Sequence, residues 1–118
     1  MQFVLTFNQP IEEIERHEDP ALAAQALAPW KSYMDDMAAA GVMRGGNRLA
    51  APWTATTVRW RGGQRLIQDG PFADTKELAA GYVVIEVSSF DEALRWAERS
   101  PSSSTGSTEI RPVAATPT

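Results

Sequence analysis

The chain has 118 residues, 43% of them apolar, and a formal net charge of −4 at neutral pH. This length fits one domain with a core of its own, and the acidic balance argues against nucleic acid as the main partner. The absence of cysteine excludes disulfides, and a lone histidine, His17, excludes a histidine-rich zinc site. We therefore expect a small molecule or a protein as the partner, and neither a metal nor a cofactor.

The sequence carries no signal for a membrane or for export. Residues 1–10 lack the basic start, the apolar run and the small-residue cleavage site of a signal peptide. No segment approaches the roughly 20 apolar residues that span a bilayer. We expect a cytoplasmic protein with no membrane contact, built as one domain over residues 1–113 with a disordered tail over residues 114–118.

The chain opens with an alternation of apolar side chains. Phe3, Leu5 and Phe7 alternate with their neighbours, which predicts a strand with one buried face. Residues 8–19 are polar and acidic and are interpreted as a loop, with about one helical turn near its middle. His17 lies in this loop among charged neighbours, so we interpret it as a solvated histidine.

A long helix is predicted next. Asp19 followed by Pro20 supplies a capping side chain and a favourable first helical residue. Apolar side chains then recur at helical spacing as far as Met37, without loss of phase across Pro29. The pattern favours one helix kinked at this proline, and a break just before it is the alternative. Gly41 is the expected C-terminal stop.

A β-hairpin is predicted in the middle of the chain. Residues 54–61 and 64–69 are rich in β-formers and are joined by Gly62-Gly63, which suits a two-residue turn. Residues 42–52 before them are interpreted as a loop with a short extended piece. Gly45-Gly46 in this loop is a weak candidate for a phosphate cradle, because no known glycine-rich motif surrounds it.

The hairpin turn fixes how the two strands align. It places Asp69 opposite Thr56, on the same face as Val58 and Ile67. Pro71 then stiffens the next turn, so the Asp69 carboxylate is held in one direction. We expect Asp69 at the mouth of a cavity as an acid, a base or an anchor. The alternative is a structural bond from this carboxylate to a nearby backbone N–H.

Other side chains are expected to complete this site. Lys76 follows the turn and is a candidate partner of Asp69 or of an anionic ligand. The remaining candidate ligand-binding residues are apolar or aromatic, namely Met43, Trp60, Phe72 and Tyr82. A general acid or base needs a carboxyl group whose pKa is raised by apolar surroundings, which these residues are able to provide.

The last third of the chain repeats a strand, helix, strand order. Residues 81–87 are apolar on both faces, which is typical of a central strand. Ser89 and Glu92 form a capping box that starts a second helix. Residues 102–107 are interpreted as a polar loop, and residues 108–113 as a final strand whose proline suits a sheet edge.

Several of these motifs together resemble the YCII-related family, in its DGPF-domain branch. The resemblance rests on Asp69-Gly70-Pro71-Phe72 with the residues that follow, on Gly81-Tyr82, and on the segments 91–97 and 109–113. It implies an α+β, ferredoxin-like βαββ(β)αβ fold of the dimeric α+β barrel type, in which two subunits pack their sheets face to face and form clefts. It also implies a bacterial protein, often encoded near alternative sigma factors.

One feature of the family is not carried over. Related small enzymes are proposed to use a helix-borne histidine with an aspartate, but the predicted helix has no histidine, and Trp30 stands near its place. The leading hypothesis is a homodimer that binds a small molecule near Asp69, with acid or base catalysis as an option. The alternatives are a non-catalytic regulatory module linked to a sigma-factor system, and a structural dimer.

Overall fold

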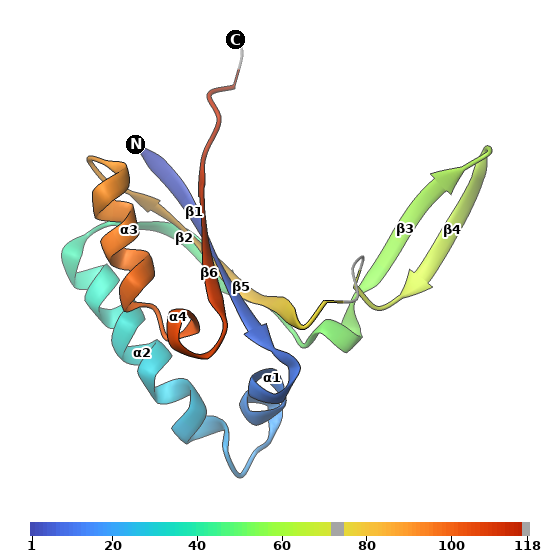
Figure 1. Cartoon of the computed structure of the whole chain (residues 1–118), viewed down its shortest axis with the longest axis horizontal. Coiled ribbons are helices and arrows are strands. Elements are labelled where there is room, and N and C mark those ends of the chain that lie inside the picture. Colours follow the sequence, from blue (N-terminus) through green and yellow to red (C-terminus); the bar gives the residue numbers. More distant parts are fainter. Residues whose placement is uncertain (72–74, 117–118) are drawn as a thin grey trace.

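The structure, a computed structural model, describes residues 1–71 and 75–116. A four-stranded antiparallel sheet lies at its centre in the order β2-β5-β1-β6 (Figure 1). The two middle strands are β5 (Glu77–Glu86) and β1 (Gln2–Pro10), and the edges are β2 (Met43–Arg48) and β6 (Ser107–Pro112). The alternation of apolar residues along β1 forms the buried face, as predicted.

Helices connect strands that are not neighbours in the sheet. Helices α1 (Ile11–Glu18) and α2 (Ala23–Ala40) lead from β1 to β2, and α3 (Phe90–Arg99) and α4 (Ser102–Thr105) lead from β5 to β6. This strand order with two crossovers is the ferredoxin-like arrangement, so the predicted α+β fold class is confirmed.

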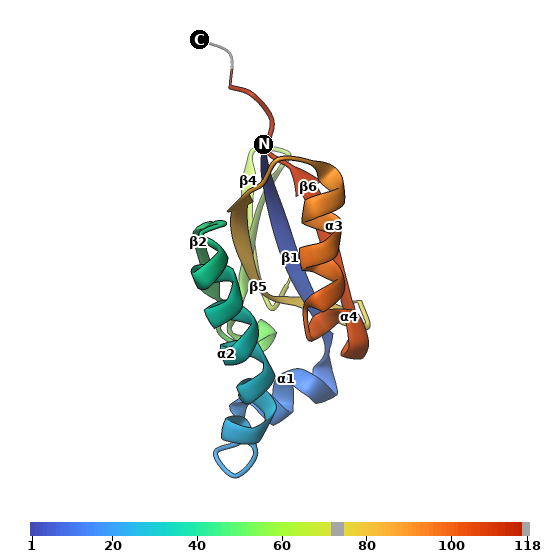
Figure 2. The same cartoon turned by 90° about the vertical axis from the view of Figure 1, so that its left-hand side faces the viewer.

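Helices α2 and α3 cover one face of the sheet (Figure 2). The apolar side chains of the two middle strands pack there against both helices, and they exclude water from the core. The largest fully buried side chains of this core are Phe3, Leu5, Met37 and Ile85. On the opposite face, Val4, Thr6, Tyr82 and Val84 are half-buried and no helix lies over them. We call this second side the uncovered face.

The predicted hairpin forms a separate two-stranded sheet. Its strands are β3 (Thr56–Arg61) and β4 (Gln64–Asp69), and the short helix η1 (Pro52–Thr54) precedes them. Thr56 pairs with Asp69, which confirms the predicted register. The hairpin stands away from the body, on the side of the sheet opposite to α2 and α3 (Figures 1 and 2).

Local signals explain the ends of both long helices. Helix α2 runs without a break through Pro29, and Gly41 ends it in the left-handed conformation with φ 71°. The Ser89 hydroxyl accepts a 3.2 Å hydrogen bond from the Glu92 amide at the start of α3. The predicted single helix through Pro29 and the predicted serine cap are confirmed. The predicted start at Asp19-Pro20 is wrong, because α2 begins at Ala23 after a turn, and no side chain of the described residues caps it.

Three segments interpreted as loops are regular elements. Residues 11–18 form helix α1, whose acidic first turn and basic last turn suit the helix dipole. Residues 43–48 form β2 despite two glycines, because pairing with β5 supplies the backbone hydrogen bonds. Residues 102–105 form the one-turn helix α4. Among the described residues, no helix is long and apolar enough to cross a bilayer.

Candidate functional site

A cavity of about 380 Å³ lies between helix α2 and the β2 edge of the sheet. Its walls are mainly apolar, and its size falls in the range of pockets that bind small molecules, which begin at about 300 Å³. The large side chains on these walls are Phe7, Leu27, Trp30, Met34, Met43 and Val83. The Phe7 and Trp30 rings meet edge to face with their centroids 4.9 Å apart, so this wall is well packed.

A glycine opens the space beneath α2. Gly46 pairs with Val83 in the sheet and lines the cavity. A Cβ atom at Gly46 would lie 2.5 Å from the backbone oxygen of Tyr82, so no other residue fits without moving the strands apart. The missing side chain therefore allows β2 to lie close to β5 at the cavity wall.

Polar groups gather at one part of the cavity wall. His17, on α1, is only 7% exposed, and its Nε2 lies 3.4 Å from Oε1 of Glu13, a distance that is within ion-pair range. Arg48, on β2, donates from Nη2 to Oε1 of Glu18 at 3.1 Å and to the backbone oxygen of His17 at 3.4 Å. Arg48 therefore connects α1 to the sheet and lines the cavity together with the histidine.

Burial is the main reason why the pKa of His17 lies below its ordinary value. The positive charges of Arg48 and Arg16 act in the same direction, whereas the carboxylate of Glu13 raises the pKa and opposes them. The result is an imidazole that is neutral at physiological pH. A neutral ring has one nitrogen that accepts a proton, so His17 is suited to act as a base.

A further polar side chain lines this cavity. Lys31 on α2 donates a 2.8 Å hydrogen bond to Asp35, and this contact raises the pKa of the lysine. Asn47 on β2 donates from Nδ2 to the Tyr82 hydroxyl at 3.0 Å; both residues border the cavity, but they alternate with Gly46 and Val83, so their side chains lie on the uncovered face. The cavity thus combines an aromatic interior with two cations and a neutral imidazole. Such a set suits a planar molecule that carries an acidic oxygen.

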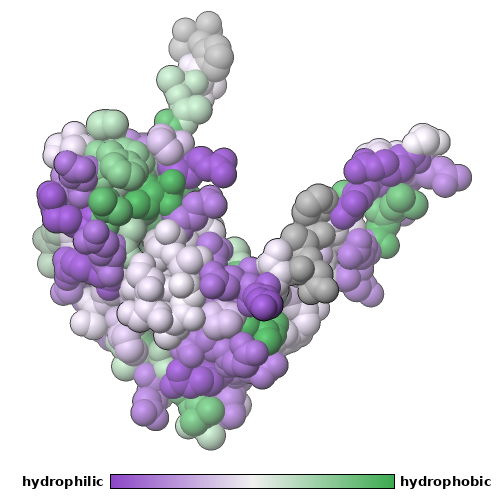
Figure 3. All heavy atoms as spheres, viewed as in Figure 1, coloured by the Kyte–Doolittle hydropathy of each residue, from purple (hydrophilic) through white to green (hydrophobic). Residues whose placement is uncertain are grey.

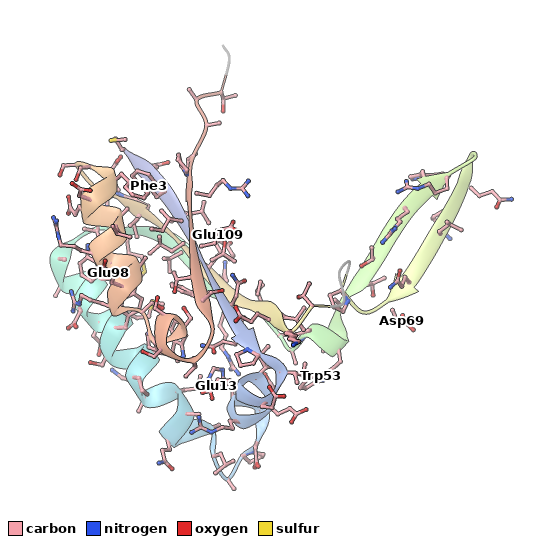
Figure 4. The ribbon with its side chains drawn as sticks, in the orientation of Figure 1. Phe3, Glu13, Trp53, Asp69, Glu98 and Glu109 are labelled. Atoms are coloured by element: carbon pink, nitrogen blue, oxygen red, sulfur yellow. The ribbon has the colours of Figure 1, made fainter. Side chains whose placement is uncertain are left out.

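The structure brings together only part of the predicted site. Met43 and Tyr82 line the cavity. Trp60 and Asp69 lie on the hairpin, exposed and away from the cavity, and Figure 4 shows Asp69 at the base of β4, far from Glu13 on α1. Lys76 is exposed just before β5. Phe72 lies outside the described residues.

The turn after Asp69 is held by its neighbours. The Gly70 amide donates a 2.7 Å hydrogen bond to the Ala55 oxygen, and the Thr57 hydroxyl donates a 2.9 Å bond to the Gly70 oxygen. The direction of the chain at this corner is therefore fixed by contacts to the backbone of Gly70, and the Asp69 side chain remains exposed.

The sequence interpretation missed His17 and Arg48. His17 was interpreted as a solvated loop residue, and this was wrong because α1 buries it against the cavity. Two signals pointed to α1: Pro10 before it, and the order of acidic and then basic residues along it. No sequence pattern indicated Arg48, since β2 forms only through its pairing with β5. Among the described residues, no cluster of three or more His, Asp or Glu is placed to hold a metal.

Comparison with solved structures supports the fold. The chain resembles 5-chloro-2-hydroxyhydroquinone dehydrochlorinase (TftG) from Burkholderia phenoliruptrix AC1100, solved in complex with 2,5-dihydroxybenzoquinone, with a TM-score of 0.50 and 15% identity. The match covers 97% of this chain and 94% of that chain. At this identity the likeness concerns the fold alone.

Comparison of sequences identifies the family. The chain is 36% identical over 101 residues to an uncharacterised protein of Rhizobium meliloti (strain 1021), covering 84% of this chain and 78% of that protein. The model of the YCII-related domain matches residues 1–116. The resemblance that the sequence motifs suggested is thus confirmed, and the chain belongs to the YCII-related family.

Proposed function

We propose that the protein binds a small molecule in the cavity between α2 and β2. The observation that carries this proposal is a buried imidazole and a guanidinium on the wall of an otherwise apolar cavity of about 380 Å³. The aromatic rings of Phe7 and Trp30 suit a planar ligand, and Arg48 and Lys31 suit an acidic oxygen on it. The ligand class is therefore a hydroxylated or carboxylated ring.

The structural neighbour supports this ligand class. TftG was solved with 2,5-dihydroxybenzoquinone, a flat ring that bears acidic hydroxyl groups. A molecule of this kind offers apolar faces to the aromatic wall and an anionic oxygen to Arg48. The uncharged part of the ring would remain in the apolar interior, where burial away from water is favourable.

His17 has the role of proton acceptor in this proposal. The neutral imidazole takes the proton from a ligand hydroxyl, which leaves an imidazolium and a ligand oxyanion. Glu13, 3.4 Å from the ring, stabilises the imidazolium, and Arg48 stabilises the oxyanion. This step conserves charge and needs no other reactant. It is sufficient for binding, and it is also the first step of base-catalysed reactions of hydroxylated rings.

The proposal includes a homodimer that buries the uncovered face. A sheet with apolar side chains on both faces is normally covered on both sides, and α2 and α3 cover only one. Asp69, Trp60 and Lys76 are exposed in one chain, so their predicted roles toward a ligand depend on a second copy. Phe72, three residues after Asp69 in the sequence, is proposed as a ligand-binding residue together with them.

Binding is tested by titrating the protein with 2,5-dihydroxybenzoquinone in a calorimeter. We expect saturable binding in wild type and an affinity about tenfold weaker in Arg48→Gln, because a charge-assisted contact is lost. Arg44→Gln is the matched control, since Arg44 lies on the same strand and outside the cavity lining, and its affinity should stay within about twofold.

The role of His17 is tested by proton exchange with the buffer. When a ring whose hydroxyl is protonated in solution binds to wild type, the transferred proton stays in the complex, so the binding enthalpy should not depend on the ionisation enthalpy of the buffer. His17→Gln has no acceptor, so ionisation of the bound hydroxyl should release the proton to the buffer and make the binding enthalpy buffer-dependent. No saturable binding to wild type, or equal loss of affinity in Arg48→Gln and Arg44→Gln, would contradict the proposed site.

The alternative of a regulatory module that acts with a sigma factor makes a different prediction. It expects a stable complex with that protein and no saturable small molecule. Neither the relative from Rhizobium meliloti nor TftG is described as a partner of a sigma factor. A pull-down with a purified sigma factor, beside the calorimetric titration, separates the two functions.

A further inference from the structure

The β3–β4 hairpin, residues 56–69, is called the arm below. Within the described part of the chain its strands pair only with each other, and the arm stands away from the body (Figure 1). The Cα radius of gyration is 16.1 Å, whereas a compact chain of this length has about 13.5 Å. An isolated two-stranded hairpin is at best marginally stable in water. The arm therefore needs a surface to pack against.

One side of the arm is apolar and exposed. Val58 and Ile67 pair across the two strands, with Trp60 next to them on the same side. Their exposed fractions are 54%, 56% and 66%. Three adjacent large apolar side chains in water are typical of a surface that contacts another protein, and tryptophan is enriched at the centre of such contacts. We call this side the apolar face of the arm.

The charge of the arm indicates which partner it fits. Three arginines and one aspartate give the arm a net charge of +2, so the rest of the chain, whose total is −4, carries −6. A second copy of this chain therefore offers an acidic body to each basic arm. Complementary charge of this kind favours association of two copies and guides their approach.

The shape of the molecule agrees with this choice. The arm and the uncovered face lie on the same side of the sheet, and an open V-shaped gap separates the arm from the body (Figure 3). Val4, Tyr82 and Val84 present half-buried apolar surface toward this side. In a two-fold dimer, each copy contributes an arm and receives one, so both exposed surfaces are covered at once.

We propose that the apolar face of each arm packs against the uncovered face of the second copy. This inference rests on the proposed homodimer and adds that the arm is the segment that joins the two copies. Asp69 lies on the same side of the arm as Val58 and Ile67, so docking brings its carboxylate into the interface. Docking of the arm then brings Trp60 and Asp69 into contact with the second chain.

The first test measures the dimer by sedimentation equilibrium in wild type and in the double variant Trp60→Ser/Ile67→Ser. We expect a dissociation constant at least about tenfold larger in the variant, because two central apolar side chains are lost. Leu66→Ser is the matched control, because Leu66 is 47% exposed on the other side of the same strand. The dissociation constant of the Leu66→Ser dimer should equal that of wild type. Circular dichroism of each variant verifies that the body remains folded.

The outcomes separate the two proposals. A wild type that is monomeric at about 100 µM overturns both the homodimer and the arm, since specific dimers of this size assemble well below that concentration. A dimer that the double variant leaves unchanged overturns the arm alone. Binding of 2,5-dihydroxybenzoquinone to the α2–β2 cavity is measured in parallel and should be the same in wild type and in Leu66→Ser, whose dimer is expected to be intact.

The second test locates the contact. The chain has no cysteine, so Ile67→Cys gives a single attachment point for a benzophenone probe. Illumination should join two chains, with the new bond mapped by mass spectrometry to β1 or β5 of the other copy. Leu66→Cys, labelled in the same way, should give much less covalent dimer. A bond that forms only within one chain, or only with α2 or α3 of the other, overturns the proposal.

Discussion

The hydroxyl of Tyr33 donates a 2.7 Å hydrogen bond to the backbone oxygen of Trp96 and so joins α2 to α3. The acceptor lies in the last turn of α3, where carbonyl groups lack a partner within the helix. The two rings also meet edge to face, with centroids 6.2 Å apart. Burial raises the pKa of Tyr33 well above its usual range, so the hydroxyl keeps its proton and remains a donor. This bond sets the spacing of the two helices that cover the sheet.

Removing the Tyr33 hydroxyl should therefore destabilise the fold. We expect Tyr33→Phe to lower the free energy of unfolding by about 1 to 2 kcal/mol, because a buried carbonyl loses its partner. Tyr82→Phe is the control, since the Tyr82 hydroxyl accepts its bond from Asn47 at an exposed position, and it should cost less than about 0.5 kcal/mol. Urea unfolding of the three proteins measures both values, and equal losses would contradict the assignment.

Two uncrowded glycines near the end of α2 isolate the energetic effect of a left-handed backbone. A Cβ atom would meet nothing within 4 Å at either Gly41 or Gly45, but only Gly41 has a left-handed backbone, with φ 71°. Gly41→Ala should cost about 1 kcal/mol of unfolding free energy, whereas Gly45→Ala should be close to neutral. Thermal unfolding of the pair tests this, and a larger loss at Gly45 would be inconsistent with the structure.

Gly46 is the opposite case, where crowding dominates. Its Cβ atom would lie 2.5 Å from the Tyr82 oxygen and 2.9 Å from a side-chain atom of Val83. We expect Gly46→Ala to cost about 1 to 3 kcal/mol as β2 is pushed from β5. The same change should weaken ligand binding in the cavity, because Gly46 lines it. Unfolding and calorimetric titration of this variant measure the two effects, and a stable variant with full affinity would argue against the close approach.

The depressed pKa of His17 predicts how stability depends on pH. Below about pH 6.5, His17 of the unfolded chain binds a proton that the folded protein resists, so this residue lowers the stability as the pH falls toward the folded-state pKa. Above that window the residue is neutral in both states and has no such effect. The loss between about pH 7 and pH 5 should therefore be smaller in His17→Gln than in wild type. Urea unfolding across this range measures it, and identical slopes would refute the burial of the imidazole.

Much of the fold was predictable because local signals and the tertiary structure agree. The alternation of Phe3, Leu5 and Phe7 gave β1 its buried face, and Gly62-Gly63 fixed the register of the arm to the residue. Strand β2 was not predictable in the same way. Its two glycines have low strand propensity, and it forms only because β5 is available for pairing.

The candidate site was predicted less well, for a related reason. Met43 and Tyr82 lie in the cavity, but the polar groups beside them come from α1 and β2, the two elements that were interpreted as loops. His17 is buried only because α1 folds back on the sheet, and the helix buries just two side chains, Ile14 and His17, which are too few to establish a helical period from the sequence. The role of Asp69 stays a prediction, since its position depends on what the arm contacts.

The placement of the four tryptophans gives the protein a built-in spectroscopic reporter. Trp96 is 8% exposed and Trp30 packs against the core, whereas Trp53 and Trp60 are 55% and 66% exposed. Figure 4 labels Trp53 beside the base of the arm. An indole that leaves water emits at shorter wavelength, so dilution of the protein should move the emission maximum to the red as arms are released. Trp60→Phe should remove most of that concentration-dependent change while the emission from the core persists.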